Sequence, residues 1–273
     1  MPILEFNGAR IAYDTAGDHH TAMPILFIHA GVADRTMWDD QWAVFAERYR
    51  VVRLDTRGFG ETVTQDVPYS NRDDVRALMD HLGIARAILI GCSRGGQIAL
   101  DTAIETPDRV GALVVIGSGP GGYEPQSLPD DYALEEVIEH EMEQAEAAEE
   151  IEKVIELDIR LWYIGPRREP AQVSSAFLDR ARPMLHRNYT HLHEGGKPII
   201  LDPPSAGRLA GVVIPVLVLV GTEDSRYALA AADYMAQTLP QARKIVIDDA
   251  AHLPSMEHPD RVNADILSFL MAL

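Results

Sequence analysis

The sequence predicts an α/β fold in which a mostly parallel sheet is flanked by helices and interrupted by a helical insertion. Short apolar stretches alternate with helical patterns over residues 1–122 and 208–273, as in strands joined by right-handed crossovers. A G-x-S-x-G motif at 91–95 lies between one such strand and a helix. Residues 123–207 contain no convincing strand pattern. We therefore expect a core formed by 1–122 and 208–273, with 123–207 inserted as a helical cap.

Six strands are predicted before the insertion. An opening hairpin over 3–6 and 10–14 is favoured by Asn7-Gly8, a dipeptide typical of two-residue turns. Ser70 or Asn71 is expected to begin a helix as its N-cap, and Pro107 marks the end of a later helical region. The remaining elements before the insertion are strands at 24–28, 51–55, 87–90 and 112–116, and helices at 37–48, 70–82 and 97–103.

The insertion and the end of the chain complete the prediction of an eight-stranded sheet. Residues 131–161 show the pattern of one long acidic helix, and 171–185 that of a second helix. The acidic run within 135–156 is interpreted as a solvated helix face. Two further elements are strands at 215–221 and 244–248, and a final helix begins near Pro259.

Ser93 is the candidate nucleophile because its surroundings match a strand–turn–helix elbow. Glycines at 91 and 95 permit a turn so tight that the serine hydroxyl stands at its apex. The alternative is a turn serine with a structural role. Cys92 is expected to point away from the apex as a buried, inert thiol.

A serine hydroxyl needs a base and an orienting acid, and both residue types occur downstream in the required chain order. Asp224 follows the nearly all-apolar strand 215–221, and His252 follows the strand 244–248. The carboxyl ends of parallel strands share one edge of a sheet, which is where ligands of such folds bind. A surface-loop role is the alternative for His252. Competing acids are Glu223 and, with less support from spacing, Asp248 and Asp249.

With these residues in place, the chain resembles the α/β-hydrolase family over nearly its whole length. The resemblance rests on His29-Ala30-Gly31 with Trp38 nearby, Asp55-Thr56-Arg57-Gly58-Phe59-Gly60-Glu61-Thr62, the elbow, Gly221 to Asp224, and Ala251-His252-Leu253-Pro254. Ala30 stands where the family usually has glycine, Thr62 where it usually has serine, and Arg94 where relatives often have methionine.

The resemblance implies a serine hydrolase without cofactor or metal. His252 would accept the Ser93 proton as Oγ attacks an acyl carbonyl, and Asp224 would orient the imidazole. The backbone N–H groups of Gly31 and Arg94 would form the oxyanion hole, and His29 would anchor its loop. A small carboxylic ester or lactone is the implied substrate, since the pattern is similar to the esterase and 3-oxoadipate enol-lactonase branch.

Other activities remain open at this point. Haloalkane dehalogenases and epoxide hydrolases of this family place Asp at the elbow, whereas this chain has Ser93. A C–C bond hydrolase or a perhydrolase remains as an alternative, as does a non-catalytic ligand sensor that retains the triad.

We expect the residues of the insertion to determine which substrate binds. Trp162, Tyr163, Arg167 and Arg168 form its aromatic and basic cluster and are candidate pocket-lining residues. Ordinary packing and surface charge pairing are the alternatives for each of them. An arginine facing the pocket would favour an acid-bearing lactone, and an apolar lining would favour simple alkyl esters.

The composition indicates which classes of partner and which cellular compartment are compatible with the chain. A net charge of −18 argues against nucleic acid as a partner, and one cysteine excludes an internal disulfide framework. No secretory leader and no apolar run of membrane-spanning length is apparent, so we expect a cytoplasmic protein without a membrane partner. A metal site at His191-Leu192-His193-Glu194 is not favoured, because no third ligand stands at a suitable spacing. A homo-oligomer is compatible with the sequence.

Overall fold

The computed structural model describes residues 1–18, 22–125, 133–191 and 194–273. The first residues of the helix expected at 131–161 lie outside the described residues, as do Leu192 and His193 of the unfavoured metal motif.

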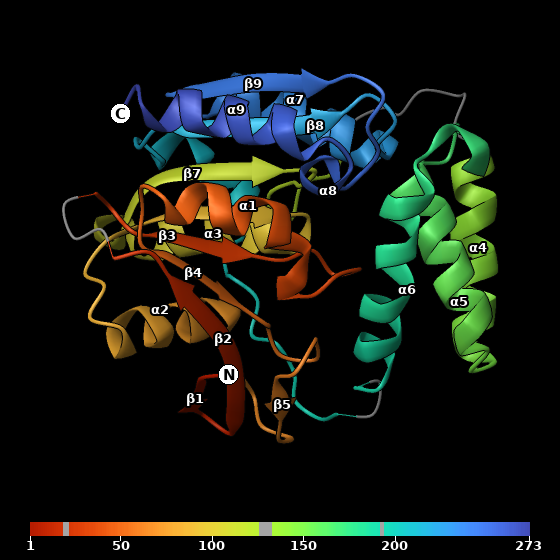
Figure 1. Cartoon of the computed structure of the whole chain (residues 1–273), viewed down its shortest axis with the longest axis horizontal. Coiled ribbons are helices and arrows are strands. Elements are labelled where there is room, and N and C mark those ends of the chain that lie inside the picture. The colour runs from red at the N-terminus through yellow and green to blue at the C-terminus, as the bar shows by residue number, and fades with distance from the viewer. Residues whose placement is uncertain (19–21, 126–132, 192–193) are drawn as a thin grey trace.

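The described strands form one mostly parallel sheet in the order β1-β2-β4-β3-β6-β7-β8-β9 (Figure 1). The strands are β1 (Ile3–Phe6), β2 (Ala9–Ala16), β3 (Ile25–Ile28), β4 (Val51–Leu54), β5 (Val63–Thr64), β6 (Ala87–Cys92), β7 (Val110–Ile116), β8 (Val216–Gly221) and β9 (Ala242–Ile247). Antiparallel pairing is found where β2 meets β1, β4 and β5, and the strands from β4 to β9 along the sheet pair in parallel. All eight predicted strands are confirmed. The two-residue strand β5, which pairs with β2, was not predicted.

Helices cover both faces of the sheet because its central strands are apolar on both sides. The helices are α1 (Asp39–Ala46), α2 (Asn71–His81), α3 (Arg94–Glu105), α7 (Arg226–Thr238), α8 (Pro254–Glu257) and α9 (Pro259–Leu270). Phe27 and Ile90 pack in one core with α1 and α9, whereas Leu26 and Leu89 pack in the other with α2, α3 and α7. Full burial on both faces is typical of parallel strands. Short 3-10 helices span Arg35–Trp38, Pro107–Arg109, Pro170–Gln172 and Ser205–Gly211.

Between β7 and β8 the chain forms a group of helices, hereafter the inserted helices. They are α4 (Ala133–Ala147), α5 (Ile151–Asp158), the π-helical segment Ile159–Ile164 and α6 (Ser175–Tyr189). They lie beside the sheet, and the arrowheads of β7 and β9 point toward them (Figure 1). The inserted helices therefore face the edge at which the parallel strands end.

The expectation of one continuous helix over 131–161 was wrong. The chain breaks after α4, and Glu149 adopts a φ of 56°, a left-handed conformation that ends helical geometry. The break allows α5 to fold back beside α4 (Figure 1), so that Val154 and Ile155 become fully buried. Burial of apolar surface thus outweighs the helical propensity of the linking residues.

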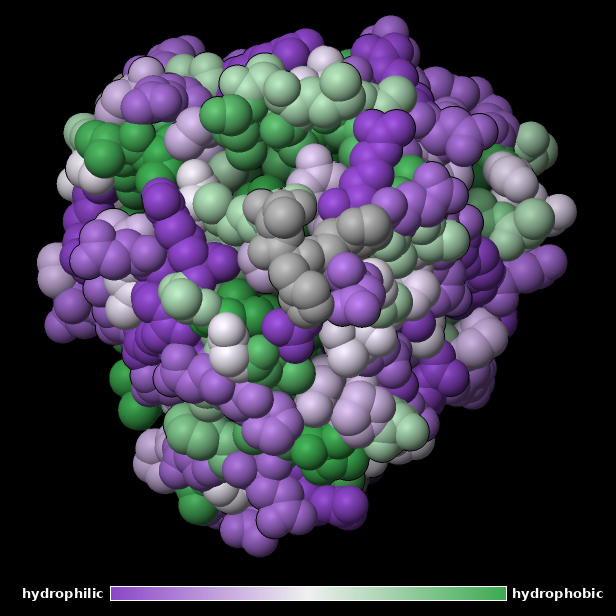
Figure 2. All heavy atoms as spheres, turned by 60° about the vertical axis from the view of Figure 1, so that its left-hand side comes forward, coloured by the Kyte–Doolittle hydropathy of each residue, from purple (hydrophilic) through white to green (hydrophobic). Residues whose placement is uncertain are grey.

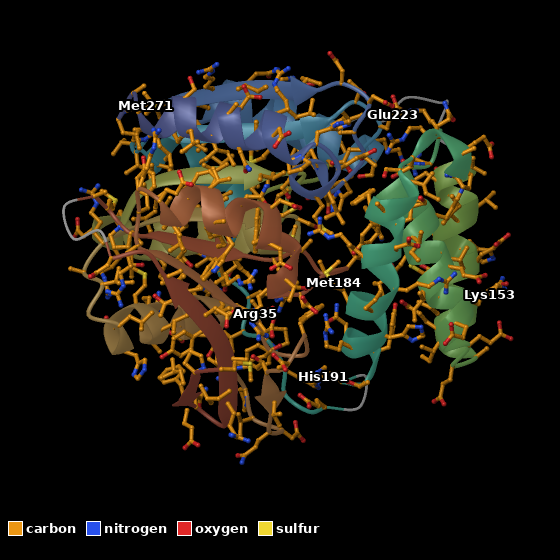
Figure 3. All side chains as sticks on the ribbon, viewed as in Figure 1. Arg35, Lys153, Met184, His191, Glu223 and Met271 are labelled. Atoms are coloured by element: carbon orange, nitrogen blue, oxygen red, sulfur yellow. The ribbon has the colours of Figure 1, made fainter. Side chains whose placement is uncertain are left out.

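Side-chain orientation distinguishes the two sides of the inserted helices (Figure 3). Met184 of α6 is buried toward the core, whereas Lys153 of α5 extends outward. Figure 2 shows that hydrophobic side chains on the viewed face lie in separate patches among hydrophilic ones. Among the helices of the described residues, none is both long and apolar enough to cross a lipid bilayer.

Candidate active site

Ser93 occupies a tight turn between β6 and α3. Its backbone has φ 50° and ψ −121°, a strained conformation for a residue with a side chain. A Cβ at Gly91 would lie 2.2 Å from the Gly95 carbonyl oxygen, and a Cβ at Gly95 would lie 2.2 Å from the Ile28 carbonyl oxygen. Larger residues at either position would therefore push α3 away from the sheet. The strain at Ser93 is typical of a functional turn.

Asp224 and His252 form a buried hydrogen-bonded pair at the edge of the sheet where the parallel strands end. Nδ1 of His252 lies 2.7 Å from Oδ1 of Asp224, and the Ser225 N–H donates to that same oxygen at 2.7 Å. Both side chains are almost fully buried. A carboxylate at Nδ1 selects the tautomer that carries its proton there, which leaves Nε2 as an acceptor.

Gly117 makes room for this pair at the end of β7. Its φ is +52°, and a Cβ there would lie 2.8 Å from the His252 carbonyl oxygen and 3.0 Å from Oδ2 of Asp224. Positive φ and close approach both favour glycine at this position. Gly117 is the first residue of a glycine-rich stretch, 117–122, that follows the sixth predicted strand.

Ser93 and His252 line the same cavity, which has a volume of about 370 Å³. This is within the range of small-molecule sites. Trp162 closes part of it, with its ring centroid 4.6 Å from that of His252. The complete lining is Ser93, Arg94, Gln97, Gly117, Ser118, Gly119, Glu135, Glu139, Trp162, Ser225, Tyr227, Ala228 and His252.

The four candidate lining residues of the insertion have different positions. Trp162 lies in the cavity wall, but Tyr163 is buried elsewhere, and its hydroxyl donates to the Val32 carbonyl at 2.7 Å. Arg167 pairs with Glu223 at 3.2 Å near the surface, and Arg168 forms a buried ion pair with a carboxylate of α8. The expectation is thus corrected for Tyr163 and Arg167, as for Arg168: their side chains join the insertion to the core and are not among the cavity lining.

Sequence reasoning missed two carboxylates in the cavity wall. Glu135 and Glu139 project from α4, and burial raises the pKa of each. Glu135 is 2% exposed, so the interpretation of a wholly solvated acidic face was wrong for this residue. Their spacing of four residues places both on one helix face, but only packing shows which face meets the cavity.

Gly31 lies on the loop after β3, next to the elbow. A Cβ there would be 3.8 Å from Cδ of Arg94, an ordinary contact distance. Gly31 also borders a second cavity of about 220 Å³, together with Phe59, Asp158 and Tyr189. Burial raises the pKa of Asp158 to about 6, and the Tyr189 hydroxyl donates to its carboxylate at 2.9 Å.

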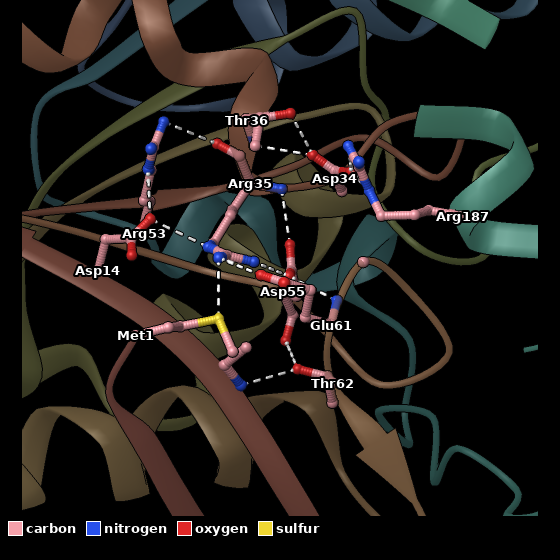
Figure 4. A network of polar contacts seen from close by, with 12 residues as sticks. Met1, Asp14, Asp34, Arg35, Thr36, Arg53, Asp55, Glu61, Thr62 and Arg187 are labelled. Carbon is pink, nitrogen blue, oxygen red and sulfur yellow. Dashed lines mark hydrogen bonds and ion pairs between the residues drawn. The ribbon is translucent and has the colours of Figure 1, made fainter. Parts of the chain in front are cut away.

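A network of polar side chains holds two loops that border the site (Figure 4). Arg35, which follows β3, pairs with Asp55 after β4 and with Asp14 of β2. The neighbouring Asp34 pairs with Arg187 of α6 at 2.7 Å. The loop after β3 is therefore fixed both to the loop after β4 and to the inserted helices.

Three other residues considered from the sequence, Cys92, Glu223 and His191, lie outside the lining of the first cavity. The Cys92 thiol is fully buried, and burial raises its pKa well above the usual value, which keeps it protonated. Glu223 pairs with Arg167 outside the cavity lining. His191 contacts Glu194 at 2.7 Å, and within the described ranges no group of three or more His, Cys, Asp or Glu side chains is arranged to hold a metal ion.

The chain is similar to known proteins over most of its length. A family model described as the alpha/beta hydrolase fold matches residues 23–259. A pimeloyl-[acyl-carrier protein] methyl ester esterase of Pectobacterium carotovorum subsp. carotovorum is 24% identical over 97% of this chain and 100% of its own. A 2-hydroxy-6-oxononadienedioate/2-hydroxy-6-oxononatrienedioate hydrolase of Paraburkholderia phymatum is 30% identical over 81% of this chain and 76% of its own.

A solved structure gives a similar result. Est816, described as an N-acyl homoserine lactone degrading enzyme, superposes with a TM-score of 0.71 at 26% identity, covering 98% of this chain and 100% of that one. Proteins similar to this chain thus include enzymes named for an ester, for a lactone and for a 2-hydroxy-6-oxo acid.

Proposed function

The chain belongs to the α/β-hydrolase family, and we propose that it hydrolyses a small carboxylic ester or lactone through an acyl-enzyme on Ser93. The observation that carries the proposal is the buried hydrogen bond between His252 and Asp224 beside a cavity that Ser93 also lines. We assign Ser93, His252 and Asp224 as nucleophile, base and orienting acid, which act together from a single sheet edge in this type of mechanism.

The first half-reaction forms the acyl-enzyme. His252 Nε2 takes the proton of the Ser93 hydroxyl while Oγ attacks the acyl carbon, and Asp224 stabilises the resulting imidazolium. The backbone N–H groups of Gly31 and Arg94 donate to the oxyanion. When the tetrahedral intermediate collapses, the bond to the leaving oxygen breaks, and His252 returns the proton to the alcohol.

Water completes the cycle. His252 removes a proton from a water molecule as its oxygen attacks the acyl carbon, and collapse of the second intermediate releases the acid and the Ser93 hydroxyl. For a lactone the alcohol remains attached to the acyl group, so the product is one hydroxy acid. The same groups serve both half-reactions.

We also propose that the inserted helices act as a cap over the cavity, with 123–207 as the cap and the remainder as the core. The cavity of about 370 Å³ suits a small acyl or alcohol group. Glu135 and Glu139 favour a neutral substrate over a carboxylate-bearing one on the α4 side of the cavity, because like charges repel at close range. Arg94 also lines the cavity, but its guanidinium already donates to Thr56 and Asn71.

Hydrolysis of a C–C bond is the second candidate, since the Paraburkholderia relative is named for a 2-hydroxy-6-oxo dioic acid. The two glutamates in the cavity wall disfavour such a dianion. Turnover of 2-hydroxy-6-oxononadienedioate exceeding that of every ester would reverse the ranking of the two candidates.

The proposal is tested with p-nitrophenyl esters from acetate to decanoate, using the wild type and Ser93→Ala. Removing the nucleophile is expected to lower kcat by roughly 10⁴-fold or more, because residual catalysis then comes only from binding and the oxyanion hole. The chain-length optimum reports the size of the pocket. An unchanged melting temperature controls for folding, and equal activity of the two proteins would refute the role of Ser93.

A further inference from the structure

His29 has a defined tautomer in the buried loop after β3. Its Nε2 accepts the Thr56 N–H at 3.0 Å, so the ring proton is on Nδ1, which donates to the Ala30 carbonyl at 2.7 Å. Burial lowers the pKa of His29, which keeps the ring neutral. The ring therefore acts as a fixed link between Thr56 and the Ala30 carbonyl.

The Thr56 hydroxyl extends this link to Arg94. Its Oγ1 lies 3.0 Å from His29 Nε2 and accepts a hydrogen bond from the Arg94 guanidinium. A hydroxyl that accepts from a cation becomes a stronger donor through its own proton. The contacts thus run in one direction, from Arg94 through Thr56 and His29 to Ala30.

The charge at the start of this chain of contacts is not neutralised by an adjacent carboxylate. Among the described residues, Arg94 has no ion pair within 4.0 Å: Asp74 is near enough to act on it electrostatically but forms its ion pair with Arg57. The Arg94 guanidinium donates to Asn71 Oδ1 at 3.2 Å and lies 4.7 Å from the Phe59 ring centroid. Burial lowers the pKa of Arg94, but the guanidinium remains charged at neutral pH. A partly buried cation without an ion-pair partner of its own acts on the dipoles it contacts.

The Ala30 carbonyl belongs to the same planar peptide unit as the Gly31 N–H. A donor at the carbonyl oxygen fixes the orientation of this plane and makes the N–H at its other end a stronger donor. Gly31 also lies against Arg94 itself, since a Cβ there would be 3.8 Å from Cδ of Arg94. The Gly31 N–H is a proposed oxyanion donor, so its strength bears on the transition state.

We propose that Arg94 is a positioning residue whose side chain, acting through Thr56 and His29, orients and polarises the Ala30–Gly31 peptide for oxyanion binding. The inference rests on the proposed serine mechanism and adds a side-chain role to the backbone role of Arg94. It predicts that the hydroxyl of Thr56, which does not line the described cavity, affects kcat more than KM.

The test compares Thr56→Val, which removes the hydroxyl at nearly constant volume, with Thr56→Ser, which retains it. Loss of a whole oxyanion donor typically costs about 10²–10³ in kcat, so weakening one donor should cost about 10–100-fold. We expect that loss for Thr56→Val on p-nitrophenyl butyrate with KM changed less than about twofold, and recovery to within about threefold in Thr56→Ser.

Arg94→Met removes the charge at similar length and provides a second route if Thr56→Val does not fold. It should also lower kcat, and the double variant Arg94→Met/Thr56→Val should lose less than the product of the single effects, because both changes interrupt one chain of contacts. If the loss of kcat in the double variant equalled the product of the losses in the two single variants, the inference would be overturned.

A trifluoromethyl ketone supplies the readout that a purely structural role would not move. It forms a tetrahedral adduct with serine, so its affinity should fall in parallel with kcat/KM across the variants. The affinity of the product butyrate should remain constant. Full activity in Thr56→Val, equal losses in Thr56→Ser and Thr56→Val, or unchanged ketone affinity would each overturn the inference. An inactive wild type would instead refute the proposed function on which it rests.

Discussion

At the carboxyl edge of the sheet, Ser93, Asp224 and His252 follow three different strands, and close backbone contacts at glycines fix their positions. The inserted helices contribute Glu135, Glu139 and Trp162 through side chains that emerge from helical surfaces. The sheet edge allows little substitution because a single Cβ would overlap neighbouring backbone atoms. The inserted helices allow more, since their contacts end in side chains. We therefore propose that the edge determines the reaction and that the inserted helices determine the substrate.

The largest effect expected from this comparison concerns the acid at the edge. Asp224→Asn removes the charge that stabilises the imidazolium and favours the wrong tautomer of His252, so kcat should fall by about 10⁴-fold. Glu223→Gln is the matched control, because Glu223 is the adjacent carboxylate and pairs with Arg167. Steady-state hydrolysis of p-nitrophenyl butyrate measures both. Comparable losses in the two variants would contradict the assignment of the acid.

A glycine substitution tests whether backbone space at the edge matters as much as the triad. Gly117→Ala would press a Cβ against His252 and Asp224, and displacing this pair by a fraction of an ångström should lower kcat by about 10²-fold. Gly83→Ala is the control, because Gly83 has a φ of +66° but no atom within 4 Å of its Cβ position. It should cost about 1–2 kcal/mol of unfolding free energy and leave kcat unchanged. Identical kinetic effects would show that strain alone is responsible.

In the inserted helices, the buried carboxyl group of Asp158 should make the stability of the protein depend on pH. Burial raises the pKa of Asp158 from its usual value of 3.8 to about 6 in the folded chain. Between about pH 4 and pH 6, Asp158 is protonated in more of the folded protein than of the unfolded chain. Its contribution to the free energy of unfolding therefore declines as pH rises through this range. Asp158→Asn should remove a penalty of at most roughly 3 kcal/mol at pH 8 and almost none at pH 4.

Urea denaturation of the wild type and Asp158→Asn at both pH values measures this difference. The variant retains an acceptor for the Tyr189 hydroxyl, which limits other losses. A stabilisation that is equal at pH 4 and pH 8 would exclude titration of Asp158 as its cause.

The smallest expected effect concerns substrate charge. Glu135→Gln should raise kcat/KM for p-nitrophenyl hemiglutarate relative to p-nitrophenyl butyrate by about 3–10-fold at pH 8, because it removes a negative charge from the cavity wall. Glu141→Gln makes the same change on an exposed position of α4 and should leave the ratio within about twofold. A ratio that both variants alter equally would indicate a general effect of net charge.

The two regions also differ in how far the sequence predicts them. The strands and the residues that follow them were predicted because continuous apolar runs and glycines report directly on buried strands and tight turns. Ser93 and His252 line one cavity and Asp224 is hydrogen-bonded to His252, in agreement with that reasoning, while the catalytic roles of the three residues remain predictions.

The errors lie in the insertion, where tertiary contacts decide the structure. The continuous helix over 131–161 is broken, because folding back buries apolar residues that a single helix would have left exposed. Tyr163 and Arg167 are polar enough to line a pocket, but they bind backbone carbonyls of the core. Glu135 belongs to a uniformly acidic pattern in which no residue type distinguishes the cavity face.

The central claim, that Ser93 is the nucleophile, is tested most directly by covalent labelling with a fluorophosphonate, which phosphonylates an activated serine with loss of fluoride. Intact mass and peptide mapping of the wild type, Ser93→Ala and Cys92→Ala separate the two neighbouring candidates. A single adduct on the wild type that persists in Cys92→Ala and disappears in Ser93→Ala is the predicted result. An adduct that persists in Ser93→Ala, or none on the folded wild type, would contradict the claim.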